Sequence, residues 1–202
     1  MTPETDDLQP YLKSTPIIDA NHRDVAATAR RVTADASSDV DKARRLFEWV
    51  RDTIPHSWDI QTRVVTCRAS DVLANKTGIC MAKSHLLAAL CRSVGIPAGF
   101  VYQRFKRELA GPEFGLHGLN AIHLDSLNRW IRVDPRGNKP GVDAQFNLEQ
   151  EQLAFPPDPE KGERIIDTIF IDPDPAVVEF LQTTPDLIEG WADLPEELQH
   201  TG

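Results

Sequence analysis

Apolar residues recur with the period of an α-helix over residues 81–94. One stripe at the i, i+3, i+4 spacing contains Leu86, Leu87, Leu90, Cys91 and Val94. The pattern predicts a helix that packs one side against a core, with Lys83, Ser84 and Arg92 mostly outside the stripe. Gly95 predicts the end of this helix, because glycine suits a left-handed C-terminal cap and the proline two residues later cannot continue a helix.

Helical signals also precede this segment. Residues 23–33 predict one helix, and Ser38 predicts the start of another, because an acidic residue follows it three positions later in a capping arrangement. The second helix continues through an apolar series and ends before Pro55. Residues 70–73 predict one further helical turn.

The hydrophobic period changes after residue 97. Residues 98–105, 116–124 and 129–133 are rich in β-forming residues and predict strands, with a loop over 106–115. Helices come first and strands afterwards, which is typical of an α+β domain. We therefore expect the helix at 81–94 to pack on an antiparallel β-sheet.

Charge and proline set the end of the chain apart. Residues 149–202 contain 14 of the 31 acidic residues but only 2 of the 22 basic ones, together with 7 of the 15 prolines. This segment cannot be one long helix. It predicts a strand at 164–171 and a short helix that opens at Asp174-Pro175. We expect it to wrap the same domain that residues 1–148 form, and its charge to be a solvated surface.

Length and composition narrow the class of protein. A chain of 202 residues with 41% hydrophobic content can bury one substantial core. Its net charge of −9, without a basic stripe, argues against nucleic acid as the partner. The first ten residues lack a signal-peptide pattern and no run of 18 apolar residues occurs, so we expect no membrane partner and a cytoplasmic location. The oligomeric state is left open.

Three cysteines fit that location better than a disulfide framework. Cys67 and Cys91 are interpreted as small apolar core residues. Cys80 differs, because it follows Gly78-Ile79 at the start of the helix at 81–94. The unpaired N–H groups and the dipole at a helix N-terminus favour a thiolate, whose pKa can fall well below the free value of ~8.5. Cys80 is therefore the candidate nucleophile.

A thiolate enzyme needs a base within hydrogen-bond reach and a group that orients the base. Four of the six histidines are poorly placed. His22 and His200 lie near the chain ends, and His56 lies in a turn-rich stretch. His85 is rotated about 140° from Cys80 around the helix. His117 and His123 remain, but they lie about 20 Å apart on one strand, so at most one can serve the thiol.

The expected hairpin indicates which of these two histidines lies near Asp134. If residues 125–128 form the turn, Leu119 lies opposite Asp134 and His117 becomes the diagonal neighbour of Asp134 on the same sheet face. His123 lies too far along the strand. A turn one residue longer or shorter would reverse the faces. The pattern thus predicts His117 as the base and Asp134 as the acid that orients it.

With these residues in place, the chain resembles the transglutaminase-like superfamily, whose fold is related to papain-like cysteine peptidases. The resemblance spans about Ala43 to Pro135. It rests on an ordered series of motifs: residues 46–52, 71–73, 76–80, 90–98, 117–120 and 130–135. It implies that residues 1–148 form the catalytic domain and that Cys80, His117 and Asp134 are nucleophile, base and orienting acid.

The same resemblance bears on the oxyanion site and on the substrate. We expect the backbone N–H of Cys80 to be one donor, because first-turn donors point outward. By analogy with upstream residues in the superfamily, Trp58 or Gln61 would supply a second; the alternative is that Trp58 is an ordinary packing residue. Leu119 and Ala121 depart from the family's usual aromatic and acidic residues, which argues against assuming a protein cross-linking specificity.

These residues support a cysteine-dependent acyl-transfer enzyme that forms a thioester from a peptide, protein or small amide substrate. Hydrolysis is favoured over transamidation, because no residue pattern marks an amine acceptor site. No metal or organic cofactor is expected. Two alternatives stay open: a non-catalytic binding module on the same fold, and a metal site formed by Cys80, His85 and His117.

Overall fold

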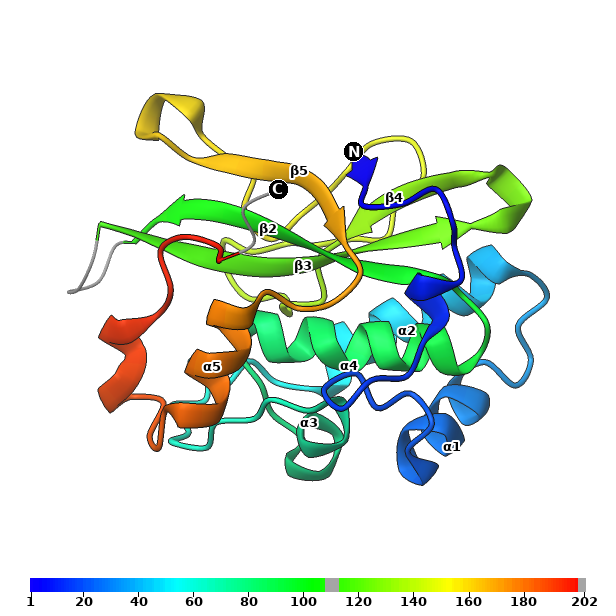
Figure 1. Cartoon of the computed structure of the whole chain (residues 1–202), viewed down its shortest axis with the longest axis horizontal. Helices are drawn as coiled ribbons and strands as arrows, with labels where there is room; N and C mark the ends of the chain where they lie inside the picture. The colour runs from blue at the N-terminus through cyan, green and yellow to red at the C-terminus, as the bar shows by residue number, and fades with distance from the viewer. Residues whose placement is uncertain (108–112, 200–202) are drawn as a thin grey trace.

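The computed structural model describes residues 1–107 and 113–199 and has the α+β architecture that the sequence predicts. Figure 1 shows the helices gathered on one side of a twisted sheet, with α4 directly beneath β2 and β3. The helices are α1 (Arg23–Val32), α2 (Asp39–Thr53), α3 (Ala69–Asn75), α4 (Cys80–Ser93) and α5 (Pro175–Thr183). The strands are β1 (Thr2–Pro3), β2 (Ala98–Lys106), β3 (Phe114–Leu124), β4 (Arg129–Val133) and β5 (Arg164–Phe170).

The sheet has the order β1-β5-β2-β3-β4. β2 pairs antiparallel with β3 and β5, and β3 pairs antiparallel with β4. β1 is the exception, because it runs parallel to β5 at one edge. A strand of two residues has no detectable alternation, so the pattern did not predict it. The loop expected at 106–115 falls mostly on residues 108–112, outside the described residues.

The predicted register of the β3–β4 hairpin is confirmed. Leu124 lies opposite Arg129 and Asn120 opposite Val133, with a short turn at Asp125–Leu127 between the strands. Asn128 completes the turn with a left-handed φ of +46°, a conformation that asparagine tolerates well. Continued by one residue, this register puts Asp134 opposite Leu119 and makes His117 its diagonal neighbour.

The helices begin and end close to the predicted residues. The hydroxyl of Ser38 accepts a hydrogen bond from the N–H of Asp41 and caps α2, as the sequence indicates. α3 is longer than the single helical turn that the sequence predicts at residues 70–73. α5 begins after Asp174, whose carboxylate accepts from the N–H of Ala176.

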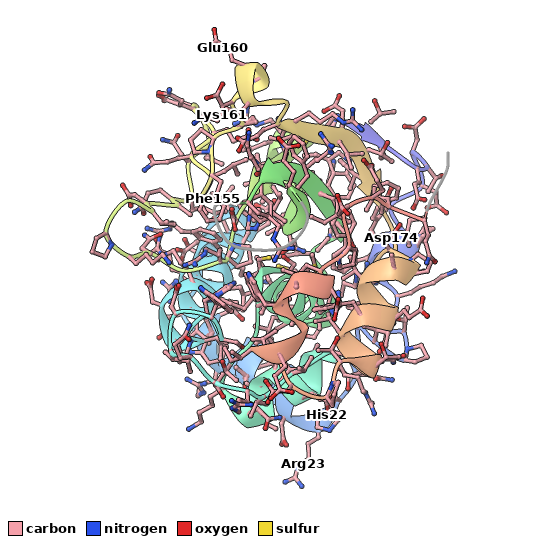
Figure 2. All side chains as sticks on the ribbon, turned by 90° about the vertical axis from the view of Figure 1, so that its left-hand side faces the viewer. His22, Arg23, Phe155, Glu160, Lys161 and Asp174 are labelled. Atoms are coloured by element: carbon pink, nitrogen blue, oxygen red, sulfur yellow. The ribbon has the colours of Figure 1, made fainter. Side chains whose placement is uncertain are left out.

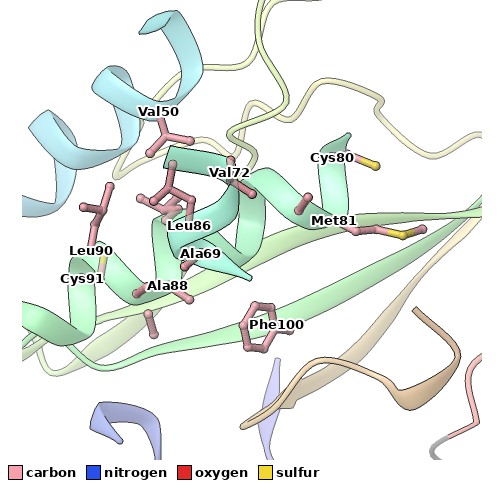
Figure 3. Close-up of a cluster of buried hydrophobic side chains, with 14 of the residues drawn as sticks. Val50, Ala69, Val72, Cys80, Met81, Leu86, Ala88, Leu90, Cys91 and Phe100 are labelled. Atoms are coloured by element: carbon pink, nitrogen blue, oxygen red, sulfur yellow. The ribbon is translucent and has the colours of Figure 1, made fainter. Parts of the chain in front are cut away.

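The prediction that α4 buries only one side is wrong. Every residue from Cys80 to Arg92 is buried, because α1, α2 and α3 cover the helix on one side and β2 and β3 on the other. Figure 3 shows Val50, Val72 and Phe100 converging on this helix from three different elements. Lys83 and Arg92 are tolerated inside because their cationic groups donate to backbone carbonyls.

The two structural cysteines behave as expected. Cys67 and Cys91 are free and buried, and burial raises the pKa of Cys67 to about 11 and that of Cys91 to about 12. Both thiols are therefore protonated at neutral pH.

Part of segment 149–202 is built into the sheet and the core. β5 pairs with β2, and Val177, Phe180 and Leu181 of α5 join the main hydrophobic cluster. In Figure 2, Glu160 and Lys161 project from one end of the molecule and Arg23 from the other. No helix within the described residues is long and apolar enough to cross a membrane. The boundary at residue 148 stays a prediction.

Gly99 provides a test of how tightly β5 is built into the sheet. A methyl group on Gly99 would lie 2.6 Å from Ile169 Cγ2 and 2.7 Å from the carbonyl oxygen of Phe170. Gly99→Ala should therefore force β5 away from β2 and lower the free energy of unfolding by about 1–3 kcal/mol in urea denaturation. Gly115→Ala is the matched control, because its methyl group meets only side-chain atoms, at 3.1 Å or more. Equal stability of the two variants would contradict this packing.

Candidate active site

The structure brings Cys80, His117 and Asp134 together from three separate elements. Cys80 is the first residue of α4, His117 lies in β3, and Asp134 follows directly after β4. Nε2 of His117 is 2.7 Å from Oδ2 of Asp134, and a side-chain hydrogen bond joins His117 to Cys80. All three side chains are buried, with the Cys80 residue 9% exposed. The imidazole thus lies between the thiol and the carboxylate.

Asp134 is held as an ion by three N–H donors. Besides His117, the backbone N–H groups of Ala154 and Arg136 donate to its two oxygens at 3.0 and 3.1 Å. Burial, the largest influence, favours the neutral acid, but the charge and hydrogen bond of His117 together with both amides outweigh it and lower the pKa of Asp134. The carboxylate is therefore available to orient and charge the imidazole.

Cys80 and His117 stabilise each other in their charged forms. Burial is the largest influence on each and favours the neutral groups. For Cys80 it is outweighed by His117 and by the backbone N–H of Gly118, which lower the pKa of the thiol. For His117 it is outweighed by Asp134 and then by Cys80, which raise the pKa of the imidazole. The arrangement favours a thiolate–imidazolium pair.

Gly118 explains how β3 comes close enough to α4 for this contact. A methyl group on Gly118 would lie 3.0 Å from the Cα of Met81, directly after the thiol. The hydroxyl of Ser84 donates to the Gly118 carbonyl at 3.0 Å, and the Asn120 amide donates to the Ser84 carbonyl at 3.1 Å. Small and polar residues thus fix the strand over the first two turns of the helix.

The expected role of the Cys80 N–H requires a correction. This N–H does not point outward unpaired, because it donates to Nε2 of His56 at 3.1 Å. Burial, followed by the charge of Arg136, lowers the pKa of His56 well below its ordinary value, so that its ring is a neutral acceptor. The contact arises from a bridge between His56 and Gly78, two positions far apart in the sequence. No local pattern around His56 signals it.

The two candidates for the second oxyanion donor have other contacts. The side-chain amide of Gln61 donates one hydrogen bond to the carbonyl of Trp58 at 2.6 Å, and its role as an oxyanion donor stays a prediction. The Trp58 ring stacks on Trp191 with centroids 4.1 Å apart, in agreement with the packing alternative. His85 is also directed elsewhere, as predicted, with Nδ1 2.7 Å from the carbonyl oxygen of Cys67. It therefore does not join Cys80 and His117 in a metal site.

No group of three or more potential metal ligands occurs within residues 1–107 and 113–199. An aromatic cleft of about 510 Å³ lies beside residues that pack on the imidazole. Its walls include Trp58, Phe105, Phe155 and Trp191. The Phe155 ring meets the edge of the His117 ring at a centroid distance of 5.2 Å. Two walls of the cleft, Phe105 and Phe155, thus pack on the imidazole, whereas His117 itself does not line the cleft.

Comparison with known proteins agrees with the observed fold. A model of the transglutaminase-like superfamily matches residues 26–135. No match was found among curated proteins. The crystal structure of a "putative cysteine protease" from Cytophaga hutchinsonii is similar, with a TM-score of 0.52 and 20% identity over 65% of this chain. The match covers 43% of that protein, so this chain spans less than half of its length.

Two further solved structures are less similar to this chain. A "putative protease" from Parabacteroides distasonis ATCC 8503 has a TM-score of 0.42 and 12% identity, covering 61% of this chain and 25% of its own. A structure named as a TGase has a TM-score of 0.40 and 19% identity, covering 65% and 34%.

The charge pairing predicts selective labelling of Cys80 by iodoacetamide. Because His117 lowers the pKa of the thiol, labelling should persist to a lower pH than that of a free thiol and be lost only as the pH falls through that lowered pKa. In His117→Ala, burial opposes the thiolate without the imidazolium, so labelling should require a pH above ~8.5. Mass spectrometry of the labelled peptides would show this, with Cys67 and Cys91 as internal controls that stay unmodified. Identical pH profiles in the two proteins would contradict the pairing.

Proposed function

The chain belongs to the transglutaminase-like superfamily, and from that premise we propose that it is a cysteine-dependent enzyme that cleaves amide bonds through a thioester. The observation that carries the proposal is the contact of His117 with both the Cys80 thiol and the Asp134 carboxylate. Nucleophile, base and orienting acid are the three groups that such chemistry requires. The substrate is a peptide, a protein or a small amide, and the proposed reaction requires no cofactor.

In the proposed reaction the Cys80 thiolate attacks the amide carbonyl carbon and forms a C–S bond. His117, as imidazolium, gives its proton to the leaving nitrogen as the C–N bond breaks, so an amine departs and a thioester remains. Water then attacks the thioester and gives a proton to His117, the C–S bond breaks, and the acid leaves. Asp134 keeps its charge throughout and holds the imidazole in place.

The oxyanion formed in the first step needs N–H donors. The Cys80 N–H can serve only if the substrate oxygen displaces Nε2 of His56 from it. Hydrolysis is proposed rather than transfer to an amine, because water is always present and no group in the aromatic cleft marks an acceptor site. A cytoplasmic location is part of the proposal and agrees with three free cysteines.

Activity should depend on all three residues. Cys80→Ala should abolish release of acid from a library of peptide and isopeptide amides, and His117→Ala and Asp134→Asn should lower kcat by about 10²–10⁴-fold. The matched control is Cys67→Ala, which removes a thiol away from the proposed triad and should keep kcat.

Mass spectrometry separates the possible outcomes of this assay. An acyl adduct on Cys80 followed by free acid supports hydrolysis, and accumulation of an amine conjugate would replace hydrolysis with transamidation. A chain that shows neither adduct nor turnover with any amide, and whose Cys80 is alkylated like an ordinary thiol, would be a binding module.

A further inference from the structure

Lys83 is a buried cation that the proposed reaction does not use. It lies one turn beyond Cys80 on α4 and has no exposed surface. Its ammonium group donates to three backbone carbonyls: Arg136 at 2.9 Å, Arg51 at 3.3 Å, and Ile54. Three donors thus meet three acceptors, which is the full capacity of a protonated lysine.

Keeping a charge at this position is costly. Burial, the largest influence, lowers the pKa of Lys83 to about 7, although the nearby carboxylates of Asp134, Asp52 and Asp59 act in the opposite direction. An apolar side chain of similar length would fill the same volume without that cost. A perturbed cation beside a candidate catalytic centre therefore calls for a functional explanation.

The three carbonyls belong to two segments that reach the proposed triad. Ile54 directly follows α2, and two residues later His56 accepts the N–H of Cys80. Arg136 follows Asp134 by two residues, and its own N–H donates to Asp134 Oδ1 at 3.1 Å. A single ammonium group thus ties the end of α2 and residues 134–137 to the helix that carries the thiol.

Residues 134–137 are held closely against Lys83. Gly137 has a φ of +108°, and a methyl group there would lie 3.3 Å from the Lys83 ammonium nitrogen and 3.3 Å from the Arg51 carbonyl oxygen. On the other side, the guanidinium of Arg136 binds both oxygens of Asp59, at 2.5 and 2.8 Å. The loop at residues 134–137, which begins with Asp134, is therefore held at two points, by Lys83 and by Asp59.

We propose that Lys83 is a positioning residue: through the Arg136 carbonyl it holds Asp134 against His117, and so maintains the charged state of Cys80. The inference rests on the proposed function. Lys83 does not touch the reacting atoms. Without its ammonium group, residues 134–137 move away from α4, Asp134 loses its alignment with His117, and the imidazolium that stabilises the thiolate becomes less populated.

Lys83→Met tests this inference against a matched control, Arg92→Met. Arg92 is also a buried cation on α4 that donates to backbone carbonyls, but it lies at the opposite end of the helix. Both variants should lower Tm. Only Lys83→Met should shift the pH midpoint of Cys80 alkylation upward by about one unit, which is about tenfold slower labelling at a pH below both midpoints. It should also lower kcat more than it raises KM.

A second pair keeps the test decisive if Lys83→Met does not fold. Gly137→Ala presses a methyl group on the Lys83 ammonium, whereas Gly141→Ala strains a similar backbone, with φ of +84°, and meets no atom within 4 Å. The proposal expects the upward midpoint shift in Gly137→Ala alone.

Three results of the labelling experiments test the positioning role of Lys83. A raised midpoint in Lys83→Met, or in Gly137→Ala where Lys83→Met does not fold, with wild-type values in the controls, supports the positioning role. A wild-type midpoint in Lys83→Met, or in Gly137→Ala where only that variant folds, overturns it while the proposed function stands. An ordinary thiol midpoint in the wild-type protein itself would overturn both.

Discussion

The hydrogen bond between the Asp134 carboxylate and the His117 imidazole is the interaction on which the proposed site depends. Both groups are buried, and an ionised carboxylate without solvent must be compensated by donors and by opposite charge. Its other donors come from residue 136, in the loop after β4, and from residue 154, in the acidic segment. One charge thus links three parts of the chain.

The consequences of that charge extend to the thiol. Asp134 favours the imidazolium, and the imidazolium favours the thiolate of Cys80, which overcomes the cost of placing a sulfur anion in a buried position. The glycine at 118 permits the approach of strand to helix, and His56 fixes the N–H at the start of α4. Packing of the fold therefore places the charges of Asp134, His117 and Cys80 in the arrangement that the proposed reaction needs.

Much of this arrangement follows from short-range rules. A strand has a period of two, so a turn of known length fixed which histidine faced Asp134, and the capping pattern at Ser38 located α2. The remaining features depend on contacts between distant segments. The burial of Lys83 could not be predicted, because this residue lies outside the apolar stripe of α4 and is covered by α2 and by the loop after β4, which are distant in the sequence. The contacts of His56 and Phe155 likewise depend on where loops cross the site.

The protonation state of His117 tests the central claim most directly. Nitrogen-15 NMR of the histidine rings across the pH range distinguishes a doubly protonated ring from either neutral tautomer. With Asp134 and Cys80 both charged beside it, His117 should carry protons on both nitrogens well above pH 7. A His117 ring that is already neutral at pH 7 would contradict the account.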